Sequence, residues 1–112
     1  SRAVRAGDFV FLTGQIPFGD DGAPMTDGTI ETQTHAVLRA ISQTLDDAGC
    51  ALSDVVKANV WLTDRADFAG FNAVYGEYFP TDPPARSAVV SELLVDARVE
   101  VEVTAYRPRE RE

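Results

Sequence analysis

Several residue types that mark particular protein classes are scarce in this sequence. Its 112 residues include one cysteine and one histidine. A single cysteine, Cys50, cannot form an internal disulfide, which fits a reducing compartment, and we interpret it as a packed or loop thiol. The single histidine, His35, has no companion ligands at a recognisable spacing. We therefore expect no metal site and interpret His35 as a surface residue.

Basic residues and long apolar runs are scarce as well. Lysine and arginine total 10 against 18 aspartate and glutamate, so the formal net charge is -8. Because binding to a phosphate backbone needs clustered basic side chains, we expect no nucleic-acid partner. No apolar run approaches the roughly 20 residues of a membrane span, and the first residues lack a signal-peptide pattern. We therefore expect a cytoplasmic protein with no membrane partner.

What is present is the composition of an ordinary folded domain. Hydrophobic residues make up 45% of the sequence and charged residues 25%, without a low-complexity segment. A chain of this length buries about two-thirds of its unfolded surface but is too short for two independent cores. We predict a single domain over residues 1–112.

Hydrophobic periodicity predicts the elements of the first half. A short strand at residues 3–5, a turn at Gly7 and Asp8 and a buried strand at residues 9–13 read as a hairpin. Apolar residues then recur at spacings of three and four. They predict an amphipathic helix over residues 29–48, with Thr29 as its N-cap and Gly49 just past its end.

In the second half, alternation over residues 54–63 predicts a half-buried strand with Val56, Ala58, Val60 and Leu62 on its core side. A second helix follows Asp64, its predicted cap, and ends before Pro80. We assign to the core its aromatic stripe of Phe68, Phe71, Tyr75 and Phe79. Residues 86–91 and 98–106 complete the predicted strands.

This order of elements predicts an α+β fold, a mixed sheet with two helices packed on one face. The other face would display a mixed set of side chains: Asn59, Trp61, Glu100, Glu102 and Thr104. Because Trp61 brings a large apolar surface to this face, we expect a homo-oligomer to cover it.

Two segments suggest chemistry. Arg86 follows Pro83 and Pro84, which hold the start of its strand rigid, and its guanidinium suits two parallel hydrogen bonds to a carboxylate. In residues 99–103, alternation puts Glu100 and Glu102 on the face opposite the valines. An anion-binding arginine and a water-orienting glutamate would form a site for a small organic acid. From the residues alone, an ordinary interface ion pair between Arg86 and Glu100 is equally open.

Six segments, in this order along the chain, resemble the motifs of one family. They are residues 9–17, Gln33-Thr34, residues 54–57, Asp67-Phe68 with residues 71–75, residues 84–87 and residues 99–102. Together they resemble the RidA family, also called the YjgF family, small proteins that include enamine and imine deaminases. The resemblance spans essentially the whole chain.

The resemblance implies a chorismate-mutase-like fold and a homotrimer with ligand clefts between subunits. It also implies hydrolysis of reactive 2-imino or enamino acids, such as 2-iminopropanoate, the tautomer of 2-aminoacrylate, to a 2-keto acid and ammonia. An imine carbon is already electrophilic, so positioning supplies much of the acceleration. We therefore expect an enzyme that needs neither a metal nor another cofactor.

The resemblance also assigns roles. Arg86 would hold the substrate carboxylate, and Glu100 would position and help to deprotonate the attacking water. Thr13, Asn72 and the main chain at Ala88 would contribute to substrate binding. Many relatives have cysteine at the position of Ala88, so thiol-dependent behaviour is not expected here. The catalytic prediction for Arg86 and Glu100 does not depend on that residue.

Glu102 lies on the same predicted face as Glu100, and for Glu102 we favour an interface hydrogen bond over catalysis. The protein could be a pathway-specific deaminase of a larger enamine, or a non-catalytic protein that binds or senses small carboxylates. Some relatives are described as translation-inhibiting ribonucleases, but the acidic balance and the lack of a histidine pair fit RNA cleavage poorly.

Overall fold

The computed structural model describes residues 1–109, and residues 110–112 of the predicted domain lie outside the described residues. The elements follow the order β1 (Ala3–Ala6), β2 (Phe9–Leu12), α1 (Ile30–Asp47), β3 (Val55–Leu62), α2 (Phe68–Tyr78), β4 (Ala85–Val90) and β5 (Val99–Tyr106). Two short 3-10 turns, Leu52–Asp54 and Arg65–Asp67, precede β3 and α2. This order confirms the predicted α+β arrangement.

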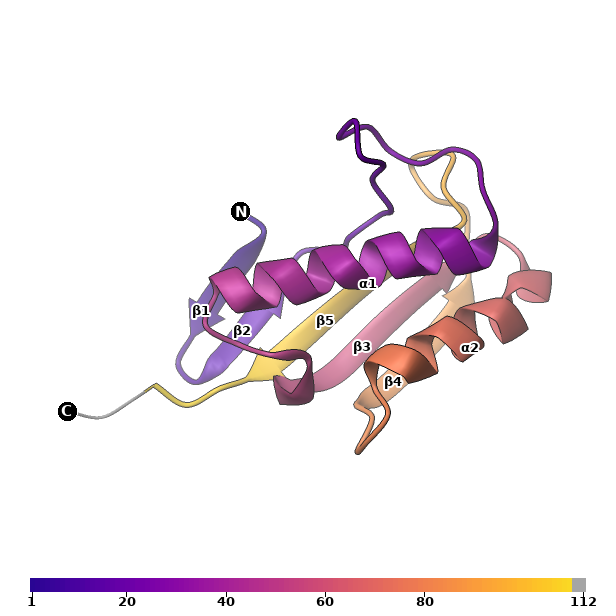
Figure 1. Ribbon diagram of the computed structural model, residues 1–112. Helices are drawn as coiled ribbons and strands as arrows, with labels where there is room; N and C mark the ends of the chain where they lie inside the picture. Colours follow the sequence, from indigo (N-terminus) through magenta and orange to yellow (C-terminus); the bar gives the residue numbers. More distant parts are fainter. Residues whose placement is uncertain (110–112) are drawn as a thin grey trace.

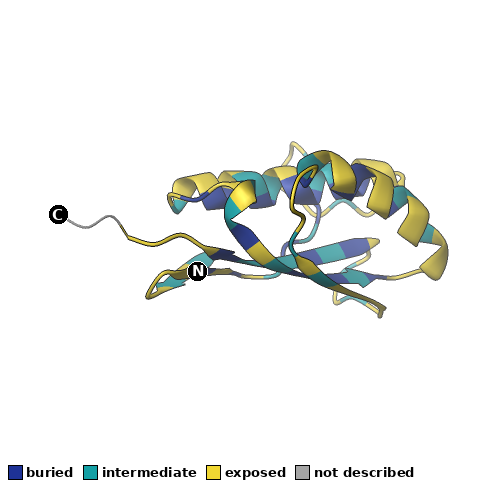
Figure 2. Ribbon diagram, turned by 90° about the horizontal axis from the view of Figure 1, so that it is seen from below, coloured by how far each residue is buried: buried dark blue, intermediate teal, exposed yellow. Residues whose placement is uncertain are grey.

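The strands form one mixed sheet in the order β1-β2-β5-β3-β4. Only β3 and β4 pair in parallel, and α2 makes the crossover that a parallel pair requires. In Figure 1, α1 and α2 run across the sheet beside each other, and Figure 2 shows both on the same side of it. The prediction of two helices on one face is confirmed.

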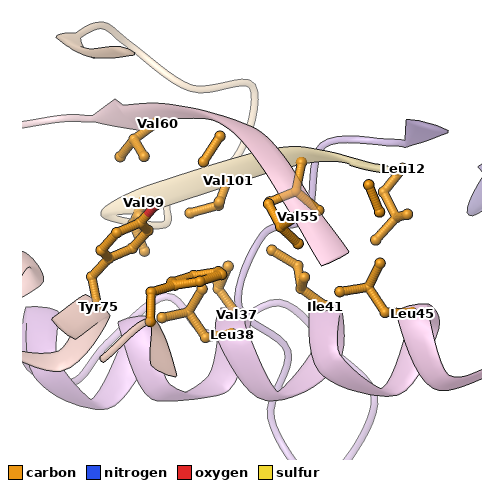
Figure 3. Close-up of a cluster of buried hydrophobic side chains, with 14 of the residues drawn as sticks. Leu12, Val37, Leu38, Ile41, Leu45, Val55, Val60, Tyr75, Val99 and Val101 are labelled. Carbon is orange, nitrogen blue, oxygen red and sulfur yellow. The ribbon is translucent and has the colours of Figure 1, made fainter. Parts of the chain in front are cut away.

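Local signals explain the longer helix. The Thr29 side chain accepts a hydrogen bond from the Thr32 amide at 3.1 Å, and Gly49 adopts φ +80° just past the last turn. Its buried face, which includes Leu38 and Ile41, packs against valines of β3 and β5 (Figure 3). No helix among residues 1–109 is long and apolar enough to cross a bilayer.

Two strand predictions were wrong in detail. Strand β2 is half-buried rather than buried, because Phe9 and Phe11 lie 42% and 47% exposed on the face that the helices leave open. In β3 the register with β5 shifts between Val55 and Lys57. This bulge turns Val56 away from the core side and leaves it 44% exposed.

The start of α2 and the surroundings of His35 also differ from the prediction. Asp64 caps the 3-10 turn by accepting from the Ala66 amide at 2.8 Å, so α2 itself begins at Phe68. Phe68 is 40% exposed, so it does not belong to the buried aromatic stripe that the sequence predicts. His35 is half-buried between the helices, where its Nδ1 lies 2.9 Å from the Tyr78 hydroxyl.

Two glycines of α2 should respond oppositely to alanine. A Cβ at Gly70 would lie 2.7 Å from Ile30 Cγ2 in α1, whereas a Cβ at Gly76 meets nothing within 4 Å. We expect Gly70→Ala to lower the free energy of unfolding by about 1–3 kcal/mol through overpacking. Gly76→Ala should raise it by about 0.5–1 kcal/mol because alanine favours the helix. Urea unfolding measures both, and equal changes would contradict the close helix contact.

Candidate functional site

Arg86 lies on the helix-covered side of the sheet, at its edge. In the sheet register Arg86 pairs with Ala58 of β3, and Ala58 pairs with Val103 of β5. Ala58 and Val103 are both buried beneath the helices. Since residues that pair across neighbouring strands share a face, the Arg86 side chain rises toward α2.

Side chains of α2 surround the Arg86 guanidinium. Its Cζ lies 4.8 Å from the ring centroid of Tyr75, 5.6 Å from that of Phe68 and 5.9 Å from that of Phe71. Its Nη1 donates a hydrogen bond of 2.7 Å to Asn72 Oδ1. Within residues 1–109 the guanidinium makes no ion pair with a carboxylate. Arg86 therefore keeps N–H donors for an external anion.

One hollow is lined in part by Arg86, and a second lies against the Phe68 ring that contacts the guanidinium. One, of about 470 Å³, is lined by Asn72, Tyr75, Gly76, Phe79, Pro83, Pro84 and Arg86. The other, of about 280 Å³, is lined by Leu62, Arg65, Phe68, Ala88, Val89 and Val90. Phe68 contacts Arg86 and also lines the second hollow, whose lining is mainly apolar. A carboxylate on Arg86 would thus have an apolar space beside it for a hydrocarbon group.

Tyr75 carries a buried hydroxyl without a hydrogen-bond partner among the described residues. Burial raises the pKa of this phenol, and the positive charge of Arg86 acts in the opposite direction. Because the net shift is upward, the hydroxyl stays protonated at neutral pH. Arg86 therefore lies against the ring of a neutral tyrosine rather than against a phenolate anion.

Glu100 lies on the opposite face of the sheet. In the register it pairs with Trp61, and the next acid, Glu102, accepts a hydrogen bond of 3.2 Å from Asn59 Nδ2. The Glu100 carboxylate lies over Gly14, where an added Cβ would overlap it. Thr13 precedes this glycine in the chain, so Thr13 and Glu100 belong to one region.

The structure therefore divides the predicted site residues into two groups. Arg86, Asn72 and Ala88 belong to the helix-covered side at β4, whereas Thr13 and Glu100 belong to the open side. An ion pair between Arg86 and Glu100 is not formed within residues 1–109. A single chain does not bring the two predicted catalytic side chains together.

Sequence reasoning missed the aromatic surroundings of Arg86. Phe68, Phe71 and Tyr75 were assigned to the core alone, yet each ring also lies against the guanidinium. Their spacing of three and four places them on the same helix face as Asn72, which was the available signal. Residue spacing within the helix could not show that β4 would place Arg86 against these rings.

The open face also carries exposed apolar side chains near β1, β2 and β5. Phe11 pairs with Val4 on one side and with Thr104 on the other, and the Phe9 ring lies 5.1 Å from that of Tyr106. Val4, Phe9, Phe11 and Tyr106 are each more than 40% exposed. A patch of this kind is typical of a surface that a partner covers.

Comparison with known proteins gives consistent likenesses. The family model described as Endoribonuclease L-PSP matches residues 1–107. A RutC family protein of Pyrococcus abyssi is 44% identical over 96% of this chain and 85% of its own length. The chloroplastic Reactive Intermediate Deaminase A of Arabidopsis thaliana is 36% identical over 94% of this chain and 57% of its own length.

A solved structure extends the likeness to three dimensions. The crystal structure of RidA from the Antarctic bacterium Psychrobacter sp. superposes with a TM-score of 0.87 at 37% identity. The match covers 94% of this chain and 85% of that one. The likeness thus extends over nearly the whole chain.

Proposed function

Because the chain belongs to the RidA family, we propose that it is an enamine and imine deaminase that hydrolyses small 2-imino acids, such as 2-iminopropanoate, to a 2-keto acid and ammonia. This proposal rests on the contacts that the Arg86 guanidinium makes and on the space beside it. The guanidinium is held by rings and by Asn72, has no carboxylate partner within residues 1–109 and borders a hollow, with a second hollow beside Phe68. These are the conditions that favour binding of a substrate carboxylate.

In the proposed reaction Arg86 binds the carboxylate, and the substrate side chain lies in the apolar hollow beside Ala88. Glu100 accepts a proton from water as the water oxygen bonds to the imine carbon. Glu100 passes this proton to the nitrogen, which gives a carbinolamine. Glu100 then transfers the hydroxyl proton of the carbinolamine to the amino group, the C–N bond breaks, and ammonia leaves as the carbonyl forms. Thr13, Asn72 and the main chain at Ala88 help to hold the substrate. No step calls for a metal or another cofactor.

Arg86 and Glu100 act together in this reaction although they lie on opposite faces of one sheet. We therefore place the site between copies of the chain, in a homotrimer with clefts between subunits, where one copy supplies Arg86 and its neighbour Glu100. The exposed apolar patch of the open face supports such an assembly, because association would remove it from water.

Two further assignments belong to the proposal. We assign the protein to the cytoplasm, although the Arabidopsis relative is named as chloroplastic, so the compartment differs among similar proteins. The matching family model carries the word endoribonuclease in its description. We favour a small-molecule substrate over RNA because the net charge of -8 opposes a polyanion.

The test is a turnover assay. A pyridoxal-phosphate-dependent dehydratase generates 2-aminoacrylate in place, and the release of pyruvate and ammonia is compared with and without this protein. We expect faster release with the protein. Equal rates would refute activity on this substrate. Binding of pyruvate without turnover would then indicate a carboxylate-binding protein, and turnover of bulkier enamines alone would indicate a pathway-specific deaminase.

A further inference from the structure

The arginine that binds the carboxylate in the proposed function is itself held by aromatic rings. A guanidinium over a ring face is attracted by the electrons of the ring, and its N–H groups at the rim stay free to donate. Asn72 Oδ1 accepts a hydrogen bond from Nη1, and the Arg86 side chain makes no other hydrogen bond within residues 1–109. The rings therefore restrain the plane of the guanidinium without using up its donors.

Tyr75 is the ring best placed to do this. It is the nearest of the three, at 4.8 Å from Cζ, and only 5% of its surface is exposed. The Phe71 ring packs against the Tyr75 ring with centroids 5.4 Å apart. The Phe79 ring also packs against the Tyr75 ring, with centroids 4.7 Å apart. A ring held in this way cannot follow a moving side chain, so it acts as a fixed surface for Arg86.

The hydroxyl of Tyr75 is not what holds Arg86. It is buried without a hydrogen-bond partner among the described residues, and none of the hydrogen bonds of Arg86 reaches it. Phenylalanine at this position would keep the ring and remove an unsatisfied polar group. The ring and the hydroxyl can therefore be tested separately.

We propose that Tyr75 is a positioning residue for Arg86. Its aromatic ring holds the guanidinium in the orientation that binds a substrate carboxylate. The proposal rests on the function proposed above. A free arginine side chain loses rotamer freedom when it binds a ligand, and a guanidinium already restrained by the ring has lost it before the ligand arrives. Removal of the ring should therefore weaken carboxylate binding while Arg86 itself is still present.

The experiment compares Tyr75→Leu, Tyr75→Phe and the wild type. Calorimetry gives the dissociation constant of pyruvate, the 2-keto acid product, and NMR follows the Arg86 Hε signal, which is assigned by its loss in Arg86→Lys. We expect Tyr75→Leu to weaken pyruvate binding about 5- to 10-fold and to move Hε downfield as the ring current disappears. Its effect on KM should exceed that on kcat.

Tyr75→Phe should bind pyruvate within about twofold of the wild type and melt at a higher temperature, because only the unsatisfied hydroxyl is lost. Leu45→Val is the matched control for a loosened core. Leu45 is fully buried at the other end of the core from Tyr75 (Figure 3), so this variant should lose stability and keep the wild-type dissociation constant.

Several outcomes would overturn the proposal. One is a Tyr75→Leu variant that binds pyruvate as the wild type does and whose Arg86 Hε signal does not move. Another is an equal loss of pyruvate affinity in Tyr75→Phe and Tyr75→Leu. If Tyr75→Leu does not fold, the wild type decides, because nuclear Overhauser contacts must then join Arg86 Hε to the ring protons of Tyr75. Absence of these contacts would refute the restraint. A wild type that shows these contacts but neither binds pyruvate nor turns over an imine would instead refute the proposed function.

Discussion

Arg86→Ala is expected to lower kcat/KM for 2-aminoacrylate by about 10- to 150-fold. This range corresponds to the loss of charge-assisted hydrogen bonds worth about 1.5–3 kcal/mol. The carboxylate does not react, so Arg86 holds it in the ground state and in the transition state alike. Most of the loss should therefore appear as a higher KM rather than a lower kcat. The dehydratase-coupled assay, run over a range of enamine supply rates, measures both parameters.

Two variants control this prediction. Arg86→Lys keeps the charge but loses the planar pair of donors, so it should fall between the wild type and Arg86→Ala. Arg39→Ala removes an exposed arginine of α1 and should leave the rate unchanged. Melting temperatures establish that each variant is folded. A folded Arg86→Ala protein with the wild-type KM would show that the carboxylate is bound elsewhere.

A mixture of two impaired variants, Arg86→Ala and Glu100→Gln, is expected to recover activity at substrate levels at which each variant alone is slow. The two side chains lie on opposite faces of one sheet, so a site that uses both draws them from different copies. In a mixed trimer, which holds two copies of one variant and one of the other, about a third of the sites would combine a native Arg86 with a native Glu100. Coexpression of two differently tagged variants, followed by tandem purification and the coupled assay, measures the recovery.

The controls for this experiment are assemblies of each variant alone, which should keep their low activity after the same treatment. Native mass spectrometry shows whether mixed assemblies have formed and gives the number of copies in each. If mixed assemblies form without recovery, Arg86 and Glu100 do not share a site between copies. A species of one copy only, active as the wild type, would contradict the oligomeric proposal directly.

Much of the fold was predictable because its signals are local. Thr29 caps α1 through its own side chain, and Gly49 adopts the positive φ that ends the helix. The alternation in β5 puts Val99, Val101 and Val103 beneath the helices, as predicted. Such features depend on neighbours within a few residues, so spacing reveals them.

The errors arose where packing between distant segments decided the result. Val56 follows the alternation in sequence, but the bulge against β5 turns it outward. Phe68 fits the helical stripe, but it lies at the first turn of α2, beside an edge strand that does not cover it. Neither the bulge nor the uncovered edge has a local signal.

The sequence by itself determined the order of elements, the family and the choice of Arg86 and Glu100 as the leading candidates. Residue types and their spacing carry that information, since they set local conformation and chemical capability. Only the tertiary structure decided that Arg86 rises beneath α2 against Tyr75 while Glu100 faces the open side. The pairing register of the strands sets which face each side chain occupies, and register depends on contacts between segments far apart in the chain.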